Sequence, residues 1–463
     1  EELHAQAPSA QLEDLLAFAG RGRFNGPSRD GLLATVREAS KQNAEWAFTL
    51  AQELAGRSLW QSDVWPALLR GMQDAGLSVD DWRRLLDLIS ESSLQSAHPH
   101  DVANFLNSLV KDGGKPFALE LLDQANAVAL STWQLLTPSA QDADGDDWVS
   151  RAINRPAGII VEFWITGLSL LTHGNTGAER IMPVNYHQWL TLVVEDTSPN
   201  GGLGRSLLAS QTAFLFGLDE GWTRRYVIPL FSASDSKRFA QAWDGFLVWG
   251  RLSPGLVDAL LPAFVAAIPR LANDLEDRRR RFVEFYTALT AFDVSDPTQQ
   301  LLPALFQQGV LEDRIVFASQ IGHILRQSQP TTKEQLWKGW LHRYWQARMQ
   351  GVFAALDVAE MKKMLEWVPY LGNAFPDAVA LATRFPLPRL EQTHVLYEMR
   401  TSELVTRFPT QAAEFLIYLA DRISSYQTAD LGTISERLPV ISAELRLRVD
   451  EALARAGVQK PQQ

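Results

Sequence analysis

The apolar residues of this chain recur every three or four positions along nearly its whole length, with polar residues between them. This period is typical of amphipathic α-helices that bury one face. It predicts helices over residues 9–20, 30–56, 63–76, 79–95, 100–112, 116–136, 205–218, 221–230, 235–249, 254–270, 273–291, 299–308, 310–327, 332–349, 356–368, 373–384, 390–399, 409–422 and 438–456. The best strand candidate is the short run LTLVVED at 190–196.

Pairs of predicted helices recur at intervals of roughly 35–45 residues, the size of one repeat in a helical solenoid. The tetratricopeptide and ankyrin signatures are not found in the sequence. Several helices have a polar start signal, and Ser78-Val-Asp-Asp81 and Thr331-Thr-Lys-Glu334 have the spacing of a capping box. The predicted fold class is therefore all-α, an irregular α-solenoid of stacked helical hairpins.

Polar segments divide the helical pattern. The strongest break is the acidic run TPSAQDADGDD at 137–147, and a softer one is EDTSPNGGLG at 195–204. Together with the resemblance described below, these breaks lead us to expect an N-terminal helical-repeat region at 1–140, a central helical domain at 141–300 and a C-terminal helical-repeat region at 301–463.

The most apolar stretch, RAINRPAGIIVEFWITGLSLLTHG at 151–174, is predicted to be a central core helix. A membrane-spanning helix needs about 20 apolar residues, whereas Ala157 to Leu171 gives only fifteen and includes Glu162. With Asn154 as the N-cap and Pro156 in the first turn, the polar residues fall on one narrow stripe. This stripe contains Arg155, Gly158, Glu162, Thr166, Ser169 and His173.

The composition narrows the class of protein. Apolar residues make up 46% of the chain and charged residues 21%, as in globular proteins. The net charge of −11 disfavours a general nucleic-acid binder. The absence of cysteine excludes disulfides, thiolate metal sites and a cysteine nucleophile, and no signal-peptide pattern is found. We expect a cytoplasmic chain, and because it begins with Glu1 rather than methionine, the question whether it is a fragment of a longer protein remains open.

Several short patterns resemble chemical motifs but depart from them. PNGGLGRS at 199–206 has Pro199 and Arg205 where a phosphate-binding loop needs glycine and lysine; an anion site at this helix N-terminus remains open. FAGRGRFNG at 18–26 follows a helical segment rather than a strand, and DADGDD at 142–147 lacks the glycine and glutamate of a calcium loop. HPHD at 98–101 has no partner cluster with metal-ligand spacing. We therefore predict no catalytic residue, metal or cofactor.

Two further segments combine positive charge with helical spacing. EDRRRRF at 276–282 is typical of a solvated helix face. LWKGWLHRYWQARMQ at 336–350 mixes Trp337, Trp340, Tyr344 and Trp345 with Lys338, Arg343 and Arg348. Aromatic and basic residues together could bind single-stranded nucleic acid, but their spacing favours a core stripe.

Three blocks resemble a known family when taken in order. They are DDWVSRAINRPAGIIVEFWITGLSLL (146–171), RSLLASQTAFLFGLDEGWTRRYVIPLF (205–231) and AWDGFLVWGRLSPGLVDALLPAF (242–264). They are similar to helical domains of unknown function that lie C-terminal to sirtuin-like NAD-hydrolysing domains in bacterial antiphage defence proteins. The resemblance covers residues 140–300. No strand with a Gly-Ala-Gly loop is found, so a sirtuin-like module is not expected in this chain.

The resemblance implies a sensor or scaffold region that binds a phage or partner protein and controls a linked NAD-hydrolysing effector, with no chemistry of its own. For partner contacts we select Arg224, Arg225, Arg278 and Arg281, because arginine is favoured at protein interfaces. We expect no membrane and no nucleic acid, and a homo-oligomer of the full-length protein remains open. The alternatives are an enzyme built from Arg155, Glu162, His173 and the HPHD pair, or a nucleic-acid scaffold using residues 336–350.

Overall fold

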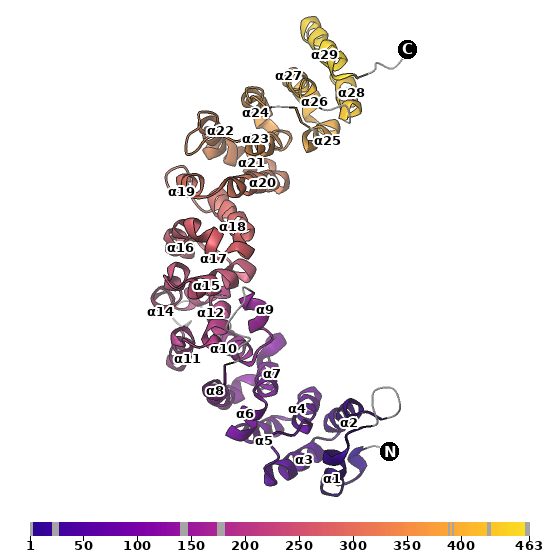
Figure 1. Ribbon diagram of the computed structural model, residues 1–463, viewed down its shortest axis with the longest axis vertical. Helices are drawn as coiled ribbons and strands as arrows, with labels where there is room; N and C mark the ends of the chain where they lie inside the picture. Colours follow the sequence, from indigo (N-terminus) through magenta and orange to yellow (C-terminus); the bar gives the residue numbers. More distant parts are fainter. Residues whose placement is uncertain are drawn as a thin grey trace. The chain divides into compact units, whose positions relative to one another are not determined.

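The computed structural model describes residues 3–20, 27–138, 147–173, 181–387, 389–390, 393–423 and 427–458. These residues form helices joined by short turns, and no strand is found among them. Two isolated bridges pair Gly20 with Ser28 and Leu390 with Ile423. The predicted all-α class of stacked helices is confirmed (Figure 1).

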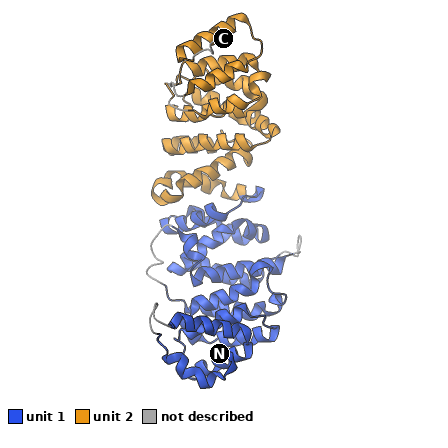
Figure 2. Ribbon diagram, turned by 90° about the vertical axis from the view of Figure 1, so that its right-hand side faces the viewer, with its two compact units in different colours: residues 1–256 blue, residues 257–463 orange. Residues whose placement is uncertain are grey.

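The chain divides into two compact units, residues 1–256 and 257–463, with the dividing point inside α16 (Pro254–Ala267) (Figure 2). The boundaries that we expect at 140 and 300 rest on composition and resemblance, and they stay predictions. FAGRGRFNG and DADGDD lie mostly outside the described residues.

Unit 1 is a stack of short helices. In chain order they are η1 (Leu3–Ala5), α1 (Pro8–Ala17), α2 (Arg29–Gln42), α3 (Ala44–Gly56), α4 (Val64–Asp74), α5 (Val79–Ile89), α6 (Ser92–Ala97), α7 (Pro99–Val110), η2 (Lys111–Gly113), α8 (Ala118–Leu135), α9 (Trp148–Ala152), α10 (Pro156–Thr172), α11 (Val184–Glu195), α12 (Pro199–Ser210), α13 (Thr212–Leu218), α14 (Glu220–Tyr226), η5 (Ile228–Ser232) and α15 (Ser236–Trp249). One row follows α2, α4, α7, α10, α12 and α15, each packing on the next. Nearly all the main contacts therefore join helices close in sequence, as in a solenoid.

Helix α10 contains the most apolar stretch and packs against α7, α8, α9, α11 and α12. Its apolar residues from Ala157 to Leu168 are buried, so the predicted core helix is confirmed. The predicted start is one residue early, because Arg155 is the N-cap and Pro156 occupies the first turn. Asn154 instead donates from Nδ2 to the carbonyl oxygen of Ser150 at 2.7 Å.

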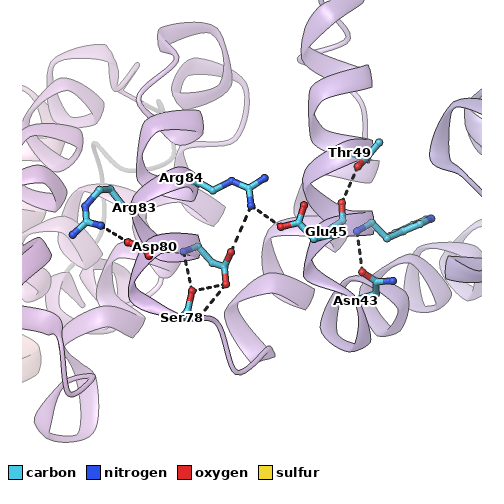
Figure 3. Close-up of polar contacts among 9 residues, drawn as sticks. Asn43, Glu45, Thr49, Ser78, Asp80, Arg83 and Arg84 are labelled. Atoms are coloured by element: carbon cyan, nitrogen blue, oxygen red, sulfur yellow. Dashed lines mark hydrogen bonds and ion pairs between the residues drawn. The ribbon is translucent and has the colours of Figure 1, made fainter.

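Polar contacts close the N-terminal turns and join neighbouring helices. At α5 the predicted capping box is confirmed: Ser78 Oγ accepts from the Asp81 backbone N–H, and the Asp81 carboxylate accepts from the Ser78 N–H. Arg84 on the same helix pairs with Glu45 on α3 at 2.6 Å (Figure 3). The side chains thus link successive layers of the stack as well as capping single helices.

Two local predictions are wrong. LTLVVED, the best strand candidate, belongs to helix α11 and its C-terminal end, because the apolar side chains of Leu190, Val193 and Val194 are buried on one helical face. The second capping box is absent: α21 begins at Pro330, after Gln329, whose side chain accepts no capping hydrogen bond. Proline at the first helical position supplies the start signal there.

Unit 2 continues the same architecture. After α16 come η6 (Ile268–Arg270), α17 (Leu271–Asp274), η7 (Glu276–Arg278), α18 (Arg279–Phe292), α19 (Leu301–Gln308), α20 (Leu311–Gln327), α21 (Pro330–Leu336), the π-helical turn η8 (Trp337–Leu341), α22 (His342–Met349), α23 (Val358–Leu365), η9 (Val368–Tyr370), η10 (Gly372–Ala374), α24 (Phe375–Ala382), α25 (His394–Thr401), α26 (Leu404–Arg407), α27 (Pro409–Ala420), α28 (Thr428–Glu436) and α29 (Ala443–Ala456). Helices α18, α20 and α23 pack in succession, as do α24, α27 and α29.

One stretch of the described chain, Pro254–Asp274, is long and apolar enough to cross a membrane by length and composition alone. It contains Pro262 and the 3-10 turn at Ile268–Arg270. Core helices of globular proteins pass the same test, so the stretch is weak evidence for a membrane span.

Candidate functional site

Two of the four selected arginines, Arg224 and Arg225, lie in the last turn of α14 and are exposed. Arg224 Nε lies 2.7 Å from Glu220 Oε1, and its guanidinium packs over the ring of Phe216. Arg225 packs beside Tyr226 and lines a pocket. Of the two, Arg225 therefore has the surroundings of a binding residue.

This pocket, here called the α11–α14 pocket, has a volume of about 720 Å³. Its walls are His187, Gln188, Thr191, Leu192 and Glu195 of α11, and Asp219, Gly221, Trp222, Arg225 and Tyr226 at α14. Helices α11 and α14 pack against each other, so residues more than thirty positions apart face one cavity. The lining combines one arginine, two carboxylates, one imidazole and two aromatic rings.

Asp219 contacts two other residues that line the α11–α14 pocket. It is the N-cap of α14, and its Oδ1 accepts from the backbone N–H of Trp222 at 2.8 Å. Its Oδ2 lies 2.8 Å from His187 Nε2. The indole of Trp222 stacks on the imidazole of His187 and donates to Thr191 Oγ1. One carboxylate therefore fixes both the start of α14 and the orientation of the imidazole.

The lining of the α11–α14 pocket has charged and aromatic groups that can recognise a ligand. A histidine oriented by a carboxylate can act as a base for a nearby nucleophile, but the described lining has no serine or cysteine. Thr191 is the one hydroxyl-bearing aliphatic side chain in the lining, and its Oγ1 accepts a hydrogen bond from the Trp222 indole. Arginine beside aromatic rings is the composition of protein-binding hot spots.

The other two selected arginines, Arg278 and Arg281, belong to unit 2. Arg278 is half-buried and is the N-cap of α18. Arg281 is exposed, lies 3.4 Å from Glu284 Oε2 and packs beside Phe285. The Arg281–Glu284 contact lies within α18.

The residues of the alternative enzyme site are not brought together. Arg155 and His173 cap opposite ends of α10, and at 1.5 Å per residue they are about 27 Å apart. Glu162 lies between them, half-buried, and accepts from Asn107 Nδ2 at 3.3 Å. A cavity of about 340 Å³ is lined in part by Glu162, Thr166 and Ser169. The polar stripe is therefore the more solvent-accessible side of α10.

The HPHD residues have structural partners of their own. His98 Nε2 lies 2.9 Å from the Trp60 carbonyl oxygen, and Asp101 pairs with Arg70 at 3.1 Å. No group of three or more histidine, aspartate or glutamate side chains with metal-binding geometry occurs among the described residues.

The aromatic segment at 336–350 is part of the core of unit 2. Trp337, Trp340, Tyr344 and Trp345 are each no more than 3% exposed, so their rings are not accessible for stacking on bases. Arg348 is also fully buried, whereas Lys338 and Arg343 are exposed. The interpretation as a core stripe is confirmed.

Arg225 is among the contact residues that we predict from the sequence, whereas His187 and Asp219 are not. Asp219 precedes the helical run EGWTRRY, which is an N-cap signal. The pairing with His187 has no sequence signature, because it depends on how α11 and α14 pack.

A family model described as a domain of unknown function (DUF4020) matches residues 292–451. The match covers less than half of the chain, from the end of α18 to α29. No curated protein matches the chain. The three blocks that resemble the sirtuin-linked family lie before residue 292, outside this match, and the likeness to that family stays a prediction.

Proposed function

We propose that this chain is a non-catalytic helical scaffold that binds a protein partner through the α11–α14 pocket. The observation that carries the proposal is the composition of that pocket: Arg225, Trp222 and Tyr226 face two carboxylates in a cavity without a serine or cysteine. A stacked-helix unit supports this role because its surface residues can change without disturbing the core.

An apolar edge beside the pocket supports a protein as the ligand. Leu192 lines the pocket and is 38% exposed, and Val184 on the same helix is 69% exposed. Aromatic and aliphatic groups near an arginine are typical of the centre of a protein interface. The pocket would take a side chain or chain end of the partner, with Arg225 pairing with a carboxylate.

The biological context of the proposal rests on the resemblance. We infer that the chain is the sensor region of a bacterial antiphage defence protein in the cytoplasm. Its partner would be a phage protein or a linked effector, and the NAD-hydrolysing activity would lie elsewhere in the full protein.

Site-specific photo-crosslinking tests the binding surface. A photoreactive residue at position 192 should capture one protein from phage-infected cells, whereas the same residue at Leu119, which is exposed on α8, should not. Arg225→Glu should abolish the adduct at 192, because it places a carboxylate opposite the expected partner carboxylate. Equal capture at both positions, or capture unaffected by Arg225→Glu, would contradict the proposed surface.

A cellular assay tests the context. Bacteria expressing the full protein should resist phage and lose NAD during infection, and Arg225→Glu should remove both effects. Arg57→Glu, a matched charge reversal at an exposed residue after α3, should leave both unchanged. Resistance without loss of NAD would refute the link to an NAD-hydrolysing effector.

A further inference from the structure

A second cavity in unit 1 lies where α12 and α15 begin. Its volume is about 350 Å³. It is lined by Trp148, Thr197, Ser198, Pro199, Arg205, Asp235, Lys237, Arg238 and Gln241. We call it the Arg205 cavity. Three of the lining side chains are basic and one is acidic, although the chain as a whole carries a net charge of −11.

Arg205 is a buried cation whose charge is not neutralised by a neighbouring acid. Only 3% of the residue is exposed. Its Nε donates to Gln241 Oε1 at 2.8 Å, and its Nη1 donates to the carbonyl oxygens of Val194 and Asp196. Among the described residues no carboxylate lies within 4.0 Å of the guanidinium, and Nη2 has no hydrogen-bond partner.

Arg238 places a second guanidinium at the same cavity. The residue is half-buried, and its guanidinium has no carboxylate within 4.0 Å among the described residues. Burial lowers the pKa of Arg205 to about 10, and the positive charge of Arg238 adds to this effect. The positive charges of the two arginines therefore repel each other.

The nearby carboxylates are engaged by the backbone. Asp235 is the N-cap of α15 and accepts from the Arg238 backbone N–H at 2.7 Å. Asp196 accepts from the backbone N–H of Ser198 at 2.7 Å. Both acids offset part of the positive charge on Arg205 from a distance, but neither forms an ion pair with it.

The start of α12 adds positive potential. The Ser198 side chain forms no capping hydrogen bond with this helix of twelve residues, so its first N–H groups are not satisfied by that cap. Lys237 and Arg238 also lie in the first turn of α15, where the helix dipole disfavours positive side chains. A bound anion would stabilise both the first N–H groups of α12 and the basic side chains in the first turn of α15.

We propose that the Arg205 cavity binds the phosphate group of a small phosphorylated molecule. Two guanidinium groups can hold a phosphate through charge-assisted hydrogen bonds, and the volume is in the range of small-molecule pockets. The site differs from a phosphate-binding loop, because the residues of PNGGLGRS from Pro199 onward form the first two turns of α12. It leaves the α11–α14 pocket free.

The glycines of this segment explain why it mimics a loop motif. A Cβ at Gly201 would lie 2.2 Å from the carbonyl oxygen of Asp196, and a Cβ at Gly204 would lie 2.4 Å from Val193. These glycines allow α12 to pack closely on the end of α11. The close packing in turn brings Arg205 against the carbonyl oxygens at that end.

Calorimetric titration of the whole chain at pH 8 tests the site, with inorganic phosphate and phenyl phosphate as probes. Both should bind in the millimolar range or tighter and raise Tm. Tighter binding of phenyl phosphate identifies a phosphomonoester as the preferred source, and tighter binding of inorganic phosphate identifies the free ion. Either result supports a phosphate site, and absence of binding by both would overturn it.

The decisive variant is Arg238→Gln, because its guanidinium has no structural ion pair and its loss should not unfold unit 1. We expect phosphate binding to weaken about ten-fold or more, as for loss of a charge-assisted hydrogen bond. The variant without phosphate should be at least as stable as the parent, since the repulsion with Arg205 is removed. Arg57→Gln carries the same charge change and should bind like the parent. Equal affinity of the parent and Arg238→Gln would overturn the proposal.

Discussion

The buried ion pair between Arg348 of α22 and Glu360 of α23 should be the most sensitive polar contact in unit 2. Both side chains are fully buried, with Nε–Oε1 and Nη2–Oε2 distances of 2.7 and 2.8 Å. Arg348 Nη1 also donates to the carbonyl oxygens of Val352 and Ala354. The Arg348 guanidinium therefore connects α22 both to α23 and to the loop between these two helices.

Glu360→Met should lower the free energy of unfolding by about 3–5 kcal/mol, because it leaves a buried cation without its counter-charge. Arg348→Met should cost a similar amount, since the carboxylate and the loop carbonyl oxygens both lose their donor. The double variant should lose less than the sum of the two, because no uncompensated charge remains. It should stay below the parent, as the loop carbonyl oxygens remain without the guanidinium.

Urea denaturation of the four proteins, followed by tryptophan fluorescence, measures this cycle. Trp345 and Trp367 pack against each other in this core and should report its loss. Arg280→Met is the control: Arg280 is 82% exposed in its ion pair with Glu284, so the cost should be below about 1 kcal/mol. A cost below about 1 kcal/mol for Glu360→Met, or strict additivity of the two substitutions, would contradict a stabilising role of the buried ion pair.

Three further outcomes are expected. Gly245→Ala should destabilise unit 1 by about 1–3 kcal/mol or more, because the new Cβ would lie 1.8 Å from the carbonyl oxygen of Ser206. In the control Gly217→Ala on α13, the new Cβ meets open space, so this variant should be neutral or stabilising. A lower Tm for Gly217→Ala than for Gly245→Ala would contradict this. Asp219→Ala should cost about 1 kcal/mol as a lost helix cap, whereas Asp219→Asn should retain most of that stability in urea melts; an equal loss would rule out the capping role. Burial raises the pKa of Tyr186, Tyr286, Tyr344, Tyr370 and Tyr418. Absorbance at 295 nm and pH 11 should therefore show fewer phenolates in the folded chain than its eight tyrosines give when it is unfolded in guanidinium. Ionisation of all eight before unfolding would contradict this burial.

The tyrosine prediction also sets a pH window for stability. An unfolded tyrosine titrates near pH 10, whereas the pKa of Tyr186 and of Tyr418 is raised to about 12. The folded state therefore binds more protons than the unfolded state between these values, and its stability falls as pH rises from about 10 towards 12. Below pH 10 this contribution is fully present.

The helices could be predicted from the sequence because each one buries a stripe that its own period defines. Helix α10 is the clearest case: its apolar run and its proline predict both the element and its central place. The strand prediction for LTLVVED was wrong. Its β-branched residues favour a strand, but the packing of α11 on α12 and α14 stabilises a helix there.

The polar contacts were less predictable than the helices. The spacing of Arg348 with the aromatic residues predicts a place on the core stripe, but it does not predict the partner of the charge: Glu360, twelve residues later, makes its burial tolerable. The His187–Asp219 pair likewise joins two helices whose contact no local pattern specifies. Arg205 was noted only as a departure from a loop motif, and its role depends on Gln241 in a third helix.

The short sequence range of the main helix contacts has a consequence for synthesis. A helix such as α4 contacts α2, α3 and α7 within a short length of chain. Helices α2 and α3 leave the ribosome shortly before α4, and α7 follows shortly after it. Each unit can therefore build its layers in order while later residues are still being translated. Low contact order also predicts rapid folding for chains of this kind. A translational pause at the end of one layer should leave a compact nascent chain with few apolar stripes exposed to aggregation.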